Sequence, residues 1–419
     1  MTGSAIPRPK TVRHLCVRCG REFPHGFTPL CECGGMVETR SDPATARLYD
    51  SDNPYVRYFD LMPIEDPENI LDAGHTATPC RHATALGQEL GLERLYLKNE
   101  TVFPTHTTKD RMATAVLSMF RELGITEFAT SSTGNSSTAF AHYAQLYPAC
   151  RPYLFTGEDF LDRLNFEDNG QTIVFALRGA TFVEAFEEAK VWAARRGVLS
   201  ERGFFNPARR AGLKTAFLEA AEQVPTTIDW YVQAVSSAMG AHGTWQGANE
   251  LRQMGVIDRP PRLLCVQQDT CCPMVKAFEA GSPEIRPEDV FAQPTGLAYA
   301  ILRGDPTRVY PYVRRVVLDS GGTFTAVSAD QVREARSMVS ELEGIDPCFA
   351  ASTAVAGLVS MARQGRIPAD HTVLINLTGG DRPTRQPPSV VHWLVRHDGD
   401  WQPEDPGDPV TRELWEGSG

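Results

Sequence analysis

Short apolar segments typical of β-strands alternate with segments of helical period along most of this chain. Such alternation predicts parallel sheets flanked by helices, an α/β architecture. The expected strands are 94–98, 127–131, 151–155, 172–177, 229–235, 262–267 and 372–377, and the expected helices are 109–124, 136–147, 181–196, 209–224, 244–254, 329–342 and 349–363. Because open parallel sheets bind ligands at the carboxyl ends of their strands, the loops after these strands are where we expect a site.

The length suggests more than one domain, since a domain usually holds about 100–200 residues and the chain has 419. We expect an N-terminal cap at 1–45, a large domain from 46–111 and 226–385, a small domain at 112–225, and a C-terminal tail at 386–419 that is rich in Pro, Asp and Gly. Internal repeats are not evident.

Charge and hydropathy exclude several partners. The formal charge is −11, from 41 basic and 52 acidic residues without a basic run, which argues against a nucleic-acid surface and favours a small-molecule ligand. No apolar run approaches the roughly 18 residues that span a bilayer, and Met1–Lys10 lacks the apolar core of a signal peptide. We therefore expect a cytoplasmic protein without a membrane segment.

Four of the ten cysteines lie near the N-terminus, as Cys16-x2-Cys19 and Cys31-x-Cys33. Two close pairs can supply the four thiolates of a tetrahedral zinc site, and a segment this short has little core of its own. The second pair has one spacer residue instead of two, so the alternative is a metal-free cap of reduced thiols.

Lys109 is difficult to explain as a structural residue. A Pro-Thr-His-Thr-Thr run precedes it, and apolar residues of helical period follow, so Lys109 is expected to open a helix. A cation in the first turn faces the positive end of the helix dipole, at a cost of about 0.3–1 kcal/mol. A lysine condensed with an aldehyde avoids that cost.

Three loops that follow expected strands carry small and hydroxyl residues. Ser131–Ser137 opens a helix and suits a carboxylate, although ordinary N-capping would explain one of its hydroxyls. In Gly240–Thr244 the N–H groups can hold a phosphate, a weak signal when taken alone. Thr378 ends the last strand before Gly379-Gly380, where it can equally be a turn residue.

Together these features resemble the fold-type II pyridoxal-phosphate enzymes, a group with a tryptophan synthase β-like fold, and threonine synthase in particular. Pro104–Arg111 resembles the family's Pro-Thr-Gly-Ser-Phe-Lys-Asp-Arg motif, and Asn206–Thr215 resembles Asn-Pro-x-Arg-x-Glu-Gly-Gln-Lys-Thr. Ser132–Ser137 is similar to the Ser-x-Gly-Asn loop, and Gly240–Thr244 to the phosphate loop. The cysteine pairs are similar to the zinc-ribbon-like start of some members, so the resemblance implies two parallel-sheet domains behind a zinc-ribbon-like cap.

The resemblance implies a role for each matching residue. Lys109 would hold pyridoxal phosphate as an internal aldimine and move the α-proton, Asn135 would bond the ring O3′, and Thr378 would face the pyridine nitrogen. Cofactor-phosphate contacts would come from Gly240, Ala241, His242, Gly243 and Thr244, substrate-carboxylate contacts from Ser132, Thr133 and Ser136, leaving-phosphate contacts from His106, Thr108, Arg111 and Arg209, and zinc ligands from Cys16, Cys19, Cys31 and Cys33.

The positions at which this chain departs from the family motif bear on which substrate it uses. His106 stands where the family has Gly, and Thr107-Thr108 replaces Ser-Phe. The run is closer to the cysteate synthase branch, which implies β-replacement of the phosphate of O-phosphoserine, through an aminoacrylate, by sulfite or another small nucleophile. Threonine synthase, acting on O-phosphohomoserine by γ-elimination and β-hydration, is the alternative. A non-catalytic amino-acid-binding or interaction protein on the same fold is an alternative of another class. A homodimer is the family-level expectation.

Overall fold

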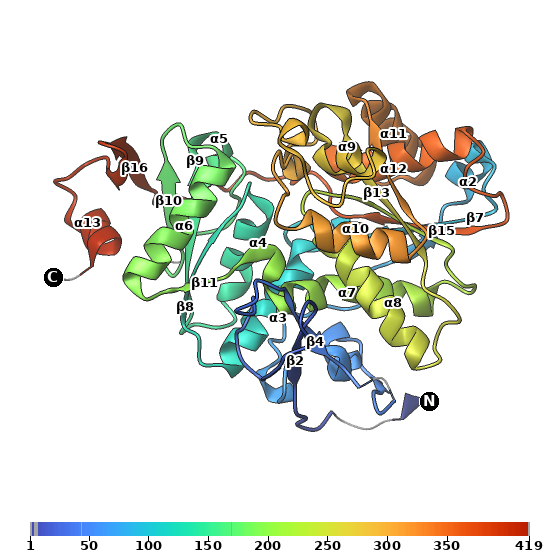
Figure 1. Ribbon diagram of the computed structural model, residues 1–419, viewed down its shortest axis with the longest axis horizontal. Helices are drawn as coiled ribbons and strands as arrows, with labels where there is room; N and C mark the ends of the chain where they lie inside the picture. Colours follow the sequence, from blue (N-terminus) through green and yellow to red (C-terminus); the bar gives the residue numbers. More distant parts are fainter. Residues whose placement is uncertain (1, 4–6, 43, 169, 418–419) are drawn as a thin grey trace.

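The computed structural model describes residues 2–3, 7–42, 44–168 and 170–417. Two six-stranded sheets dominate it, and they lie side by side with helices on both faces of each (Figure 1). A three-stranded sheet near the N-terminus forms a separate small cap. No helix in the described ranges is long and apolar enough to cross a membrane.

The larger sheet has the strand order β14-β13-β12-β15-β7-β6 and is parallel except for β6, which runs antiparallel to β7. Its strands are β6 (Cys80–His82), β7 (Arg94–Asn99), β12 (Trp230–Ala234), β13 (Arg262–Gln268), β14 (Thr323–Val327) and β15 (Thr372–Leu377). One face packs against α2 (Thr84–Leu90), α11 (Ala329–Glu343) and α12 (Phe349–Arg363). The other face packs against α1 (Pro54–Arg57), α7 (Pro207–Gln223), α8 (Met239–Gln253), α9 (Pro273–Glu279) and α10 (Tyr310–Asp319). The central strands are buried on both faces, as expected for parallel sheets.

The smaller sheet has the order β11-β8-β9-β10-β16-β17, parallel except for the last pair. Its strands are β8 (Glu127–Ser131), β9 (Arg151–Gly157), β10 (Ile173–Leu177), β11 (Leu199–Ser200), β16 (His392–His397) and β17 (Asp400–Pro403). On one face lie α3 (Lys109–Glu122) and α4 (Asn135–Ala144), and on the other α6 (Phe182–Arg196) and α13 (Pro409–Glu416). The short α5 (Glu158–Leu161) follows β9.

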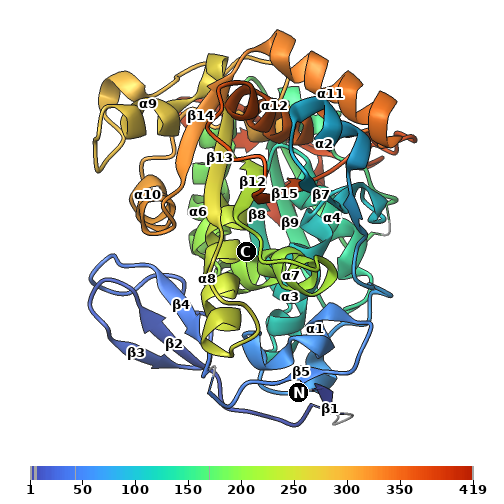
Figure 2. The same cartoon turned by 90° about the vertical axis from the view of Figure 1, so that its right-hand side faces the viewer.

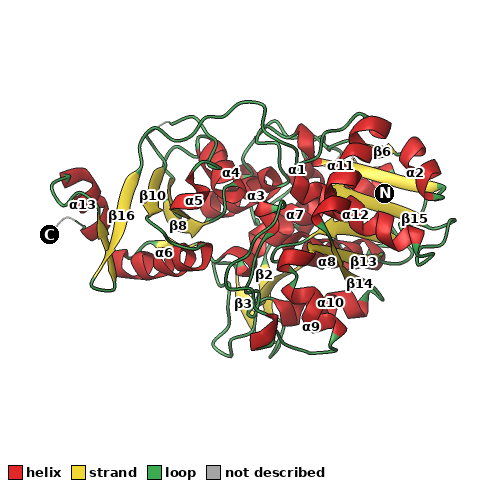
Figure 3. Ribbon diagram, turned by 90° about the horizontal axis from the view of Figure 1, so that it is seen from above, coloured by secondary structure: helices red, strands yellow, loops and turns green. Residues whose placement is uncertain are grey.

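The packing differs from the expected domain division in two places. The described part of residues 386–419, which we expect as a tail, adds β16 to the edge of the smaller sheet beyond β10 (Figure 3). The apolar Leu394, Trp401 and Trp415 bury themselves against Trp192, which explains why this polar segment is fixed there. In addition, α7, which we expect in the small domain, contributes to both cores: Ala208 and Leu213 pack with α3 and α4, and Phe217 packs beneath the larger sheet.

The cap consists of the antiparallel β2 (Arg13–Cys16), β3 (Glu22–Pro24) and β4 (Val37–Arg40). A short parallel pair, β1 (Thr2–Gly3) with β5 (Leu48–Tyr49), lies nearby. The cap lies beside α8 and below α10 in Figure 2. It is attached by Arg210, whose Nη2 donates to the Val37 carbonyl oxygen at 2.6 Å, and by Tyr312, whose hydroxyl accepts from the Met36 N–H at 3.1 Å.

Many expected elements match the observed ones. Strands 127–131 and 372–377 and helix 349–363 coincide with β8, β15 and α12. The sequence reading missed β14, α9 and α10, and it placed the start of α8 five residues too late, at 244 instead of Met239. That last difference changes which residues of the loop reach the site.

Candidate active site

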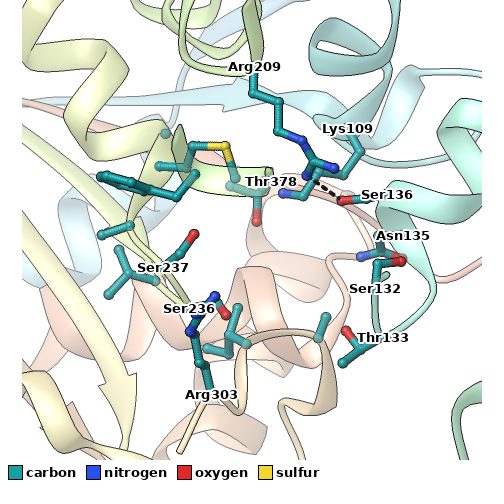
Figure 4. A pocket seen from close by; sticks show the side chains of 18 of the residues that line it. Lys109, Ser132, Thr133, Asn135, Ser136, Arg209, Ser236, Ser237, Arg303 and Thr378 are labelled. Atoms are coloured by element: carbon teal, nitrogen blue, oxygen red, sulfur yellow. Dashed lines mark hydrogen bonds between the residues drawn. The ribbon is translucent and has the colours of Figure 1, made fainter. Parts of the chain in front are cut away.

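One large pocket lies where the loops that follow β8, β12 and β15 meet the start of α3. It is lined by Lys109, by Ser131–Thr133, Asn135 and Ser136 after β8, by Ala234–Gly240 after β12, and by Thr378–Gly380 after β15. Figure 4 shows Lys109 and Thr378 on one side of the cavity and Ser132, Thr133 and Asn135 on another. Because β12 and β15 are parallel neighbours, their loops leave the same edge of the larger sheet, and the loop after β8 of the smaller sheet meets them at the pocket.

Lys109 is the first residue of α3, as expected, and its amine faces this pocket. Burial and the nearby Arg209 lower the pKa of Lys109 to about 8. No carboxylate in the described part of the chain pairs with its amine, whereas Lys98 pairs with Glu219 and Lys214 with Glu250. A partly buried lysine without a counter-ion is much closer to its neutral, nucleophilic form than an ordinary surface lysine.

The turn before Lys109 is held against the end of β15. The Thr108 N–H donates to the Thr378 carbonyl oxygen at 2.9 Å, and the Gly380 N–H donates to the His106 carbonyl oxygen at 3.0 Å. His106 has a φ of 57°, a left-handed conformation that a non-glycine residue adopts only at a cost. His106 and Thr108 both line the pocket, which leaves their contact with a leaving phosphate a prediction, and the buried Thr108 Oγ1 has no partner among the described residues.

The loop after β8 is shaped by its own hydroxyls. Ser132 Oγ accepts hydrogen bonds from the N–H groups of Gly134 and Ser137, at 3.1 and 3.0 Å. Gly134 has a φ of 123°, which a residue with a Cβ rarely adopts, and α4 begins at the next residue. Ser132, Thr133 and Ser136 therefore surround the N-terminus of α4, where a carboxylate is stabilised by free N–H groups.

Asn135 lines the same pocket, and its Oδ1 accepts a hydrogen bond of 2.8 Å from Arg382 Nη2. The amide NH2 of Asn135 is then the group that can serve a ligand. Arg382 also donates to the Thr105 carbonyl oxygen at 3.1 Å. Sequence reasoning missed Arg382 because the contact joins residues 247 positions apart.

The predicted phosphate turn is displaced toward the N-terminus. Since α8 already begins at Met239, residues 241–244 lie within the helix and do not line the pocket, which keeps only Gly240 of the five predicted residues. His242 Nε2 instead lies 3.3 Å from Glu38 Oε1 of the cap, and burial lowers the pKa of His242 to about 4. The prediction that His242 contacts the phosphate is therefore wrong, and so is the placement of Gly243 and Thr244. The Ala241 N–H precedes the first intrahelical bond of α8, which His242 donates to the Ala238 carbonyl oxygen, so a contact from Ala241 stays a prediction.

The segment that faces the cavity is Ser236–Gly240, which the sequence reading did not assign to the phosphate apart from Gly240. Ala238, the residue before the helix, has a φ of 56° and turns the chain sharply into α8. Several N–H groups at this N-terminus have no carbonyl partner within the helix, so they can bind an anion. The signal that would have found the segment is its place directly after β12.

Arg111 does not line the pocket, which corrects its prediction as a phosphate contact. Arg111 is fully buried between two carboxylates: its Nε lies 2.6 Å from Glu100 Oε2, and its Nη1 lies 2.5 Å from Glu219 Oε1. Two positions along a helix correspond to a rotation of about 200°, so Arg111 points away from the direction that Lys109 takes.

Arg209 does line the pocket, but a buried carboxylate already holds it. Its Nε lies 2.5 Å from Glu201 Oε1, and its Nη2 pairs with the other oxygen of Glu201. The remaining Nη1 donates to Ser136 Oγ at 3.3 Å, drawn as the dashed line in Figure 4. Glu201 therefore holds two of the three guanidinium nitrogens of Arg209, and only Nη1, beside Ser136, remains for a substrate.

The four N-terminal cysteines come together as predicted. The Sγ atoms of Cys16, Cys19, Cys31 and Cys33 all lie within 4.8 Å of one another. The one-residue spacer of the second pair does not prevent this, because Gly34 takes a φ of 77° in the turn that follows. Four clustered thiols are the ligand set of a structural zinc site. The neighbouring Leu30 lines the pocket, so the cap reaches the candidate active site.

A family model described as pyridoxal-phosphate dependent enzyme matches residues 71–379. The chain belongs to this family. The predicted family and the fold-type II architecture are confirmed, and the chain is an enzyme of the pyridoxal-phosphate dependent class. The pocket described above lies largely within the matched residues.

Curated relatives of two activities resemble the chain about equally. The threonine synthase of Methanocaldococcus jannaschii is 29% identical over 374 residues, covering 87% of this chain and 91% of the relative. The cysteate synthase of Methanoculleus marisnigri is 31% identical over 389 residues, covering 89% of each.

Solved structures of the same fold include maize serine racemase, with a TM-score of 0.59, 16% identity and coverage of 73% of this chain and 88% of that one. The processed form of threonine deaminase isoform 2 from Solanum lycopersicum has a TM-score of 0.57 at 17% identity, covering 73% of this chain and 80% of that one. These likenesses establish the fold alone.

The pocket fits the cofactor that the family carries. Three buried polar atoms at its wall, Thr108 Oγ1, Ser131 Oγ and Asn376 Oδ1, have no partner in the described residues. Lys109 would offer the amine, Ser236–Gly240 would hold the phosphate, and the Thr378 hydroxyl would face the ring nitrogen. When bound, the cofactor supplies an aldehyde for an amine and a ring that withdraws electrons from the substrate's α-carbon.

Proposed function

We propose that the enzyme replaces a leaving group on an O-phosphorylated or similarly activated amino acid. The preferred reaction is β-replacement of the phosphate of O-phosphoserine by sulfite or another small nucleophile, as in the relatives named cysteate synthase. The observation that carries the proposal is the juxtaposition in one pocket of the uncompensated Lys109 amine and the carboxylate-sized loop Ser132–Ser136.

Each residue near the pocket then has a task. The helix N-terminus at Asn135 and the hydroxyls of Ser132 and Thr133 bind the α-carboxylate of the substrate. The Lys109 amine removes the α-proton, the bond from the β-carbon to the phosphate oxygen breaks, and the nucleophile adds to the β-carbon as a proton returns to the α-carbon. Thr378, as a neutral hydroxyl, does not hold a protonated ring nitrogen as a carboxylate would, which favours elimination over transamination.

The leaving phosphate is left with fewer contacts than the sequence suggested. With Arg111 turned away and Arg209 paired, His106 and Thr108 are the predicted contacts that remain free at the pocket. Both belong to the turn that opens α3, so they lie near the lysine. A leaving group close to the lysine is consistent with a short substrate such as phosphoserine, whereas phosphohomoserine carries its phosphate one carbon further out.

A substrate comparison tests the reaction. Purified enzyme is mixed with O-phosphoserine or O-phosphohomoserine, each with and without sulfite, while phosphate release and the products are measured by mass spectrometry. We expect release from phosphoserine and cysteate when sulfite is present. Release from phosphohomoserine alone, with threonine as the product, would instead establish the threonine synthase alternative.

The role of Lys109 is tested separately by the bound cofactor. The wild-type protein should show a visible absorption band that borohydride abolishes, and Lys109→Ala should lack the band and lose phosphate release. The control is Lys276→Ala, because Lys276 lies outside the pocket; this variant should keep the absorption band and phosphate release. A colourless wild-type protein would favour a non-catalytic role.

A further inference from the structure

Arg303 is a cation in the pocket without an acidic partner. It lines the same cavity as Ser236–Gly240, and Figure 4 shows its guanidinium directed into the cavity on the side where Ser236 and Ser237 lie. Its Nε donates to the Asp305 carbonyl oxygen at 3.1 Å, while the Asp305 carboxylate accepts from the Thr307 N–H. Among the described residues no carboxylate forms an ion pair with Arg303, and burial lowers its pKa.

Hydrogen bonds hold the backbone around Arg303, and the Nε–Asp305 bond holds its side chain. The Arg303 N–H donates to the Ile301 carbonyl oxygen at 2.8 Å, and the next residue, Gly304, accepts from the Phe291 N–H at 3.0 Å. The segment is tied to the end of β13 because the Ala298 N–H donates to Gln268 Oε1 at 3.0 Å. A partly buried, unpaired guanidinium on a fixed segment is costly unless an anion joins it.

The anion site beside it lacks a charge of its own. The segment Ser236–Gly240 contains no lysine or arginine, and N–H groups at a helix end are equivalent to only about half a positive charge. A phosphate monoester carries a charge of about −1.5 to −2 at neutral pH. A guanidinium can compensate the remaining negative charge of the phosphate, because its planar fork can bind two phosphate oxygens.

We propose that Arg303 binds the phosphate group of the cofactor, beside the segment Ser236–Gly240 that leads into α8. The proposal rests on the cofactor of the family and does not depend on which amino acid is the substrate. The competing occupant is an anionic group of the substrate, since Arg202 and Arg308 line the same pocket. The experiment below separates these two occupants.

The test measures the affinity of the apo-protein for pyridoxal phosphate and for pyridoxal, which lacks the phosphate, by titration of the visible absorbance. We expect Arg303→Met to raise the dissociation constant of pyridoxal phosphate by about ten-fold or more, the usual effect of losing a charged hydrogen bond. The constant for pyridoxal should stay within about two-fold of the wild type. Arg303→Lys should lie between, and Arg333→Met, at an exposed position outside the pocket, should leave both constants unchanged.

The outcomes are distinct. The proposal would be overturned if Arg303→Met and Arg303→Lys weakened the binding of pyridoxal phosphate and of pyridoxal equally. It would also be overturned if the affinity for pyridoxal phosphate were unchanged. Unchanged cofactor affinity with a raised KM for the amino acid would assign Arg303 to the substrate instead. Circular dichroism of the apo-variants checks folding, and if Arg303→Met does not fold, the Arg303→Lys and Arg303→Gln variants decide by the same criterion.

Discussion

At the scale of single residues, charge identifies candidates but does not show which of them reach the site. Lys109, Arg111 and Arg209 all lie in motifs that resemble those of the family, yet the structure gives them three different surroundings. Lys109 is unpaired at the pocket, Arg209 is paired at its wall, and Arg111 is buried between Glu100 and Glu219. Whether each cation is paired depends on carboxylates from other parts of the fold: Glu201 reaches Arg209, and Glu100 and Glu219 reach Arg111, but none reaches Lys109 among the described residues.

Replacing Arg111 should therefore reduce stability and not substrate affinity. In Arg111→Leu the buried carboxylate of Glu100 loses its ion-pair partner and Glu219 keeps only Lys98. Breaking such a buried pair costs about 3–5 kcal/mol. Urea unfolding measures the loss, with Arg121→Leu as the control because Arg121 is an exposed residue on the same helix. A stable Arg111→Leu variant with a raised KM would restore the original prediction of a phosphate contact.

The lowered pKa of Lys109 predicts how uptake of the cofactor depends on pH. Only the neutral amine attacks the aldehyde, and with a pKa of about 8 half of Lys109 is neutral near pH 8. The rate at which apo-protein takes up pyridoxal phosphate should thus rise with pH and reach its midpoint near that value, followed by stopped-flow absorbance. Nα-acetyl-lysine, whose ε-amine is free in water, is the reference, and the midpoint of its reaction should lie about two pH units higher. A protein midpoint equal to that of the reference would contradict a desolvated lysine.

At the scale of elements, the position of a helix start decides which loop residues are exposed to the pocket. The beginning of α8 at Met239 turns Ser236–Gly240 into the anion-binding segment and buries His242 against the cap. The end of the chain shows the same principle, because β16 and α13 close the outer part of the smaller sheet. The indole of Trp415 is buried there, with its ring centroid 6.5 Å from that of Trp192.

Trp415→Ala should destabilise the smaller sheet, even though it lies near the end of the chain. Truncating a buried tryptophan typically costs about 3–5 kcal/mol. Val410→Ala on the same helix is the matched control, since Val410 is 57% exposed, and such a surface change usually stays within about 0.5 kcal/mol. Urea unfolding of both variants gives the comparison, and equal stabilities would mean that residues 386–419 act as a loose tail.

At the scale of the whole molecule, the cap and the two sheets meet around one pocket. Leu30 extends from the cap to the cavity, directly before the ligand candidate Cys31, and Arg210 ties β4 to α7. We therefore expect the state of the cysteine cluster to affect the site although no cysteine of the cluster lines it.

Metal analysis tests this connection. The wild-type protein should contain about one zinc per chain, and Cys31→Ser should lose the metal and bind the cofactor more weakly. Cys80→Ser, which lies outside the cluster, should keep both properties. A wild-type protein without metal, or Cys31→Ser with full metal content, would show that the cap is held by its thiols and its packing alone.

The sequence by itself determined the alternation of strands and helices, the lysine that opens α3, the clustering of four cysteines and the family. These features follow from local periodicity, helix-start chemistry and short spacings, which neighbouring residues specify. The tertiary structure alone decided that Arg111 is internal, that Arg209 pairs with Glu201, and that Ser236–Gly240 and Arg303 face the cavity. It also decided that β16 and Trp415 return to the smaller sheet. Each of these depends on contacts between residues on different elements, whose geometry no local pattern encodes.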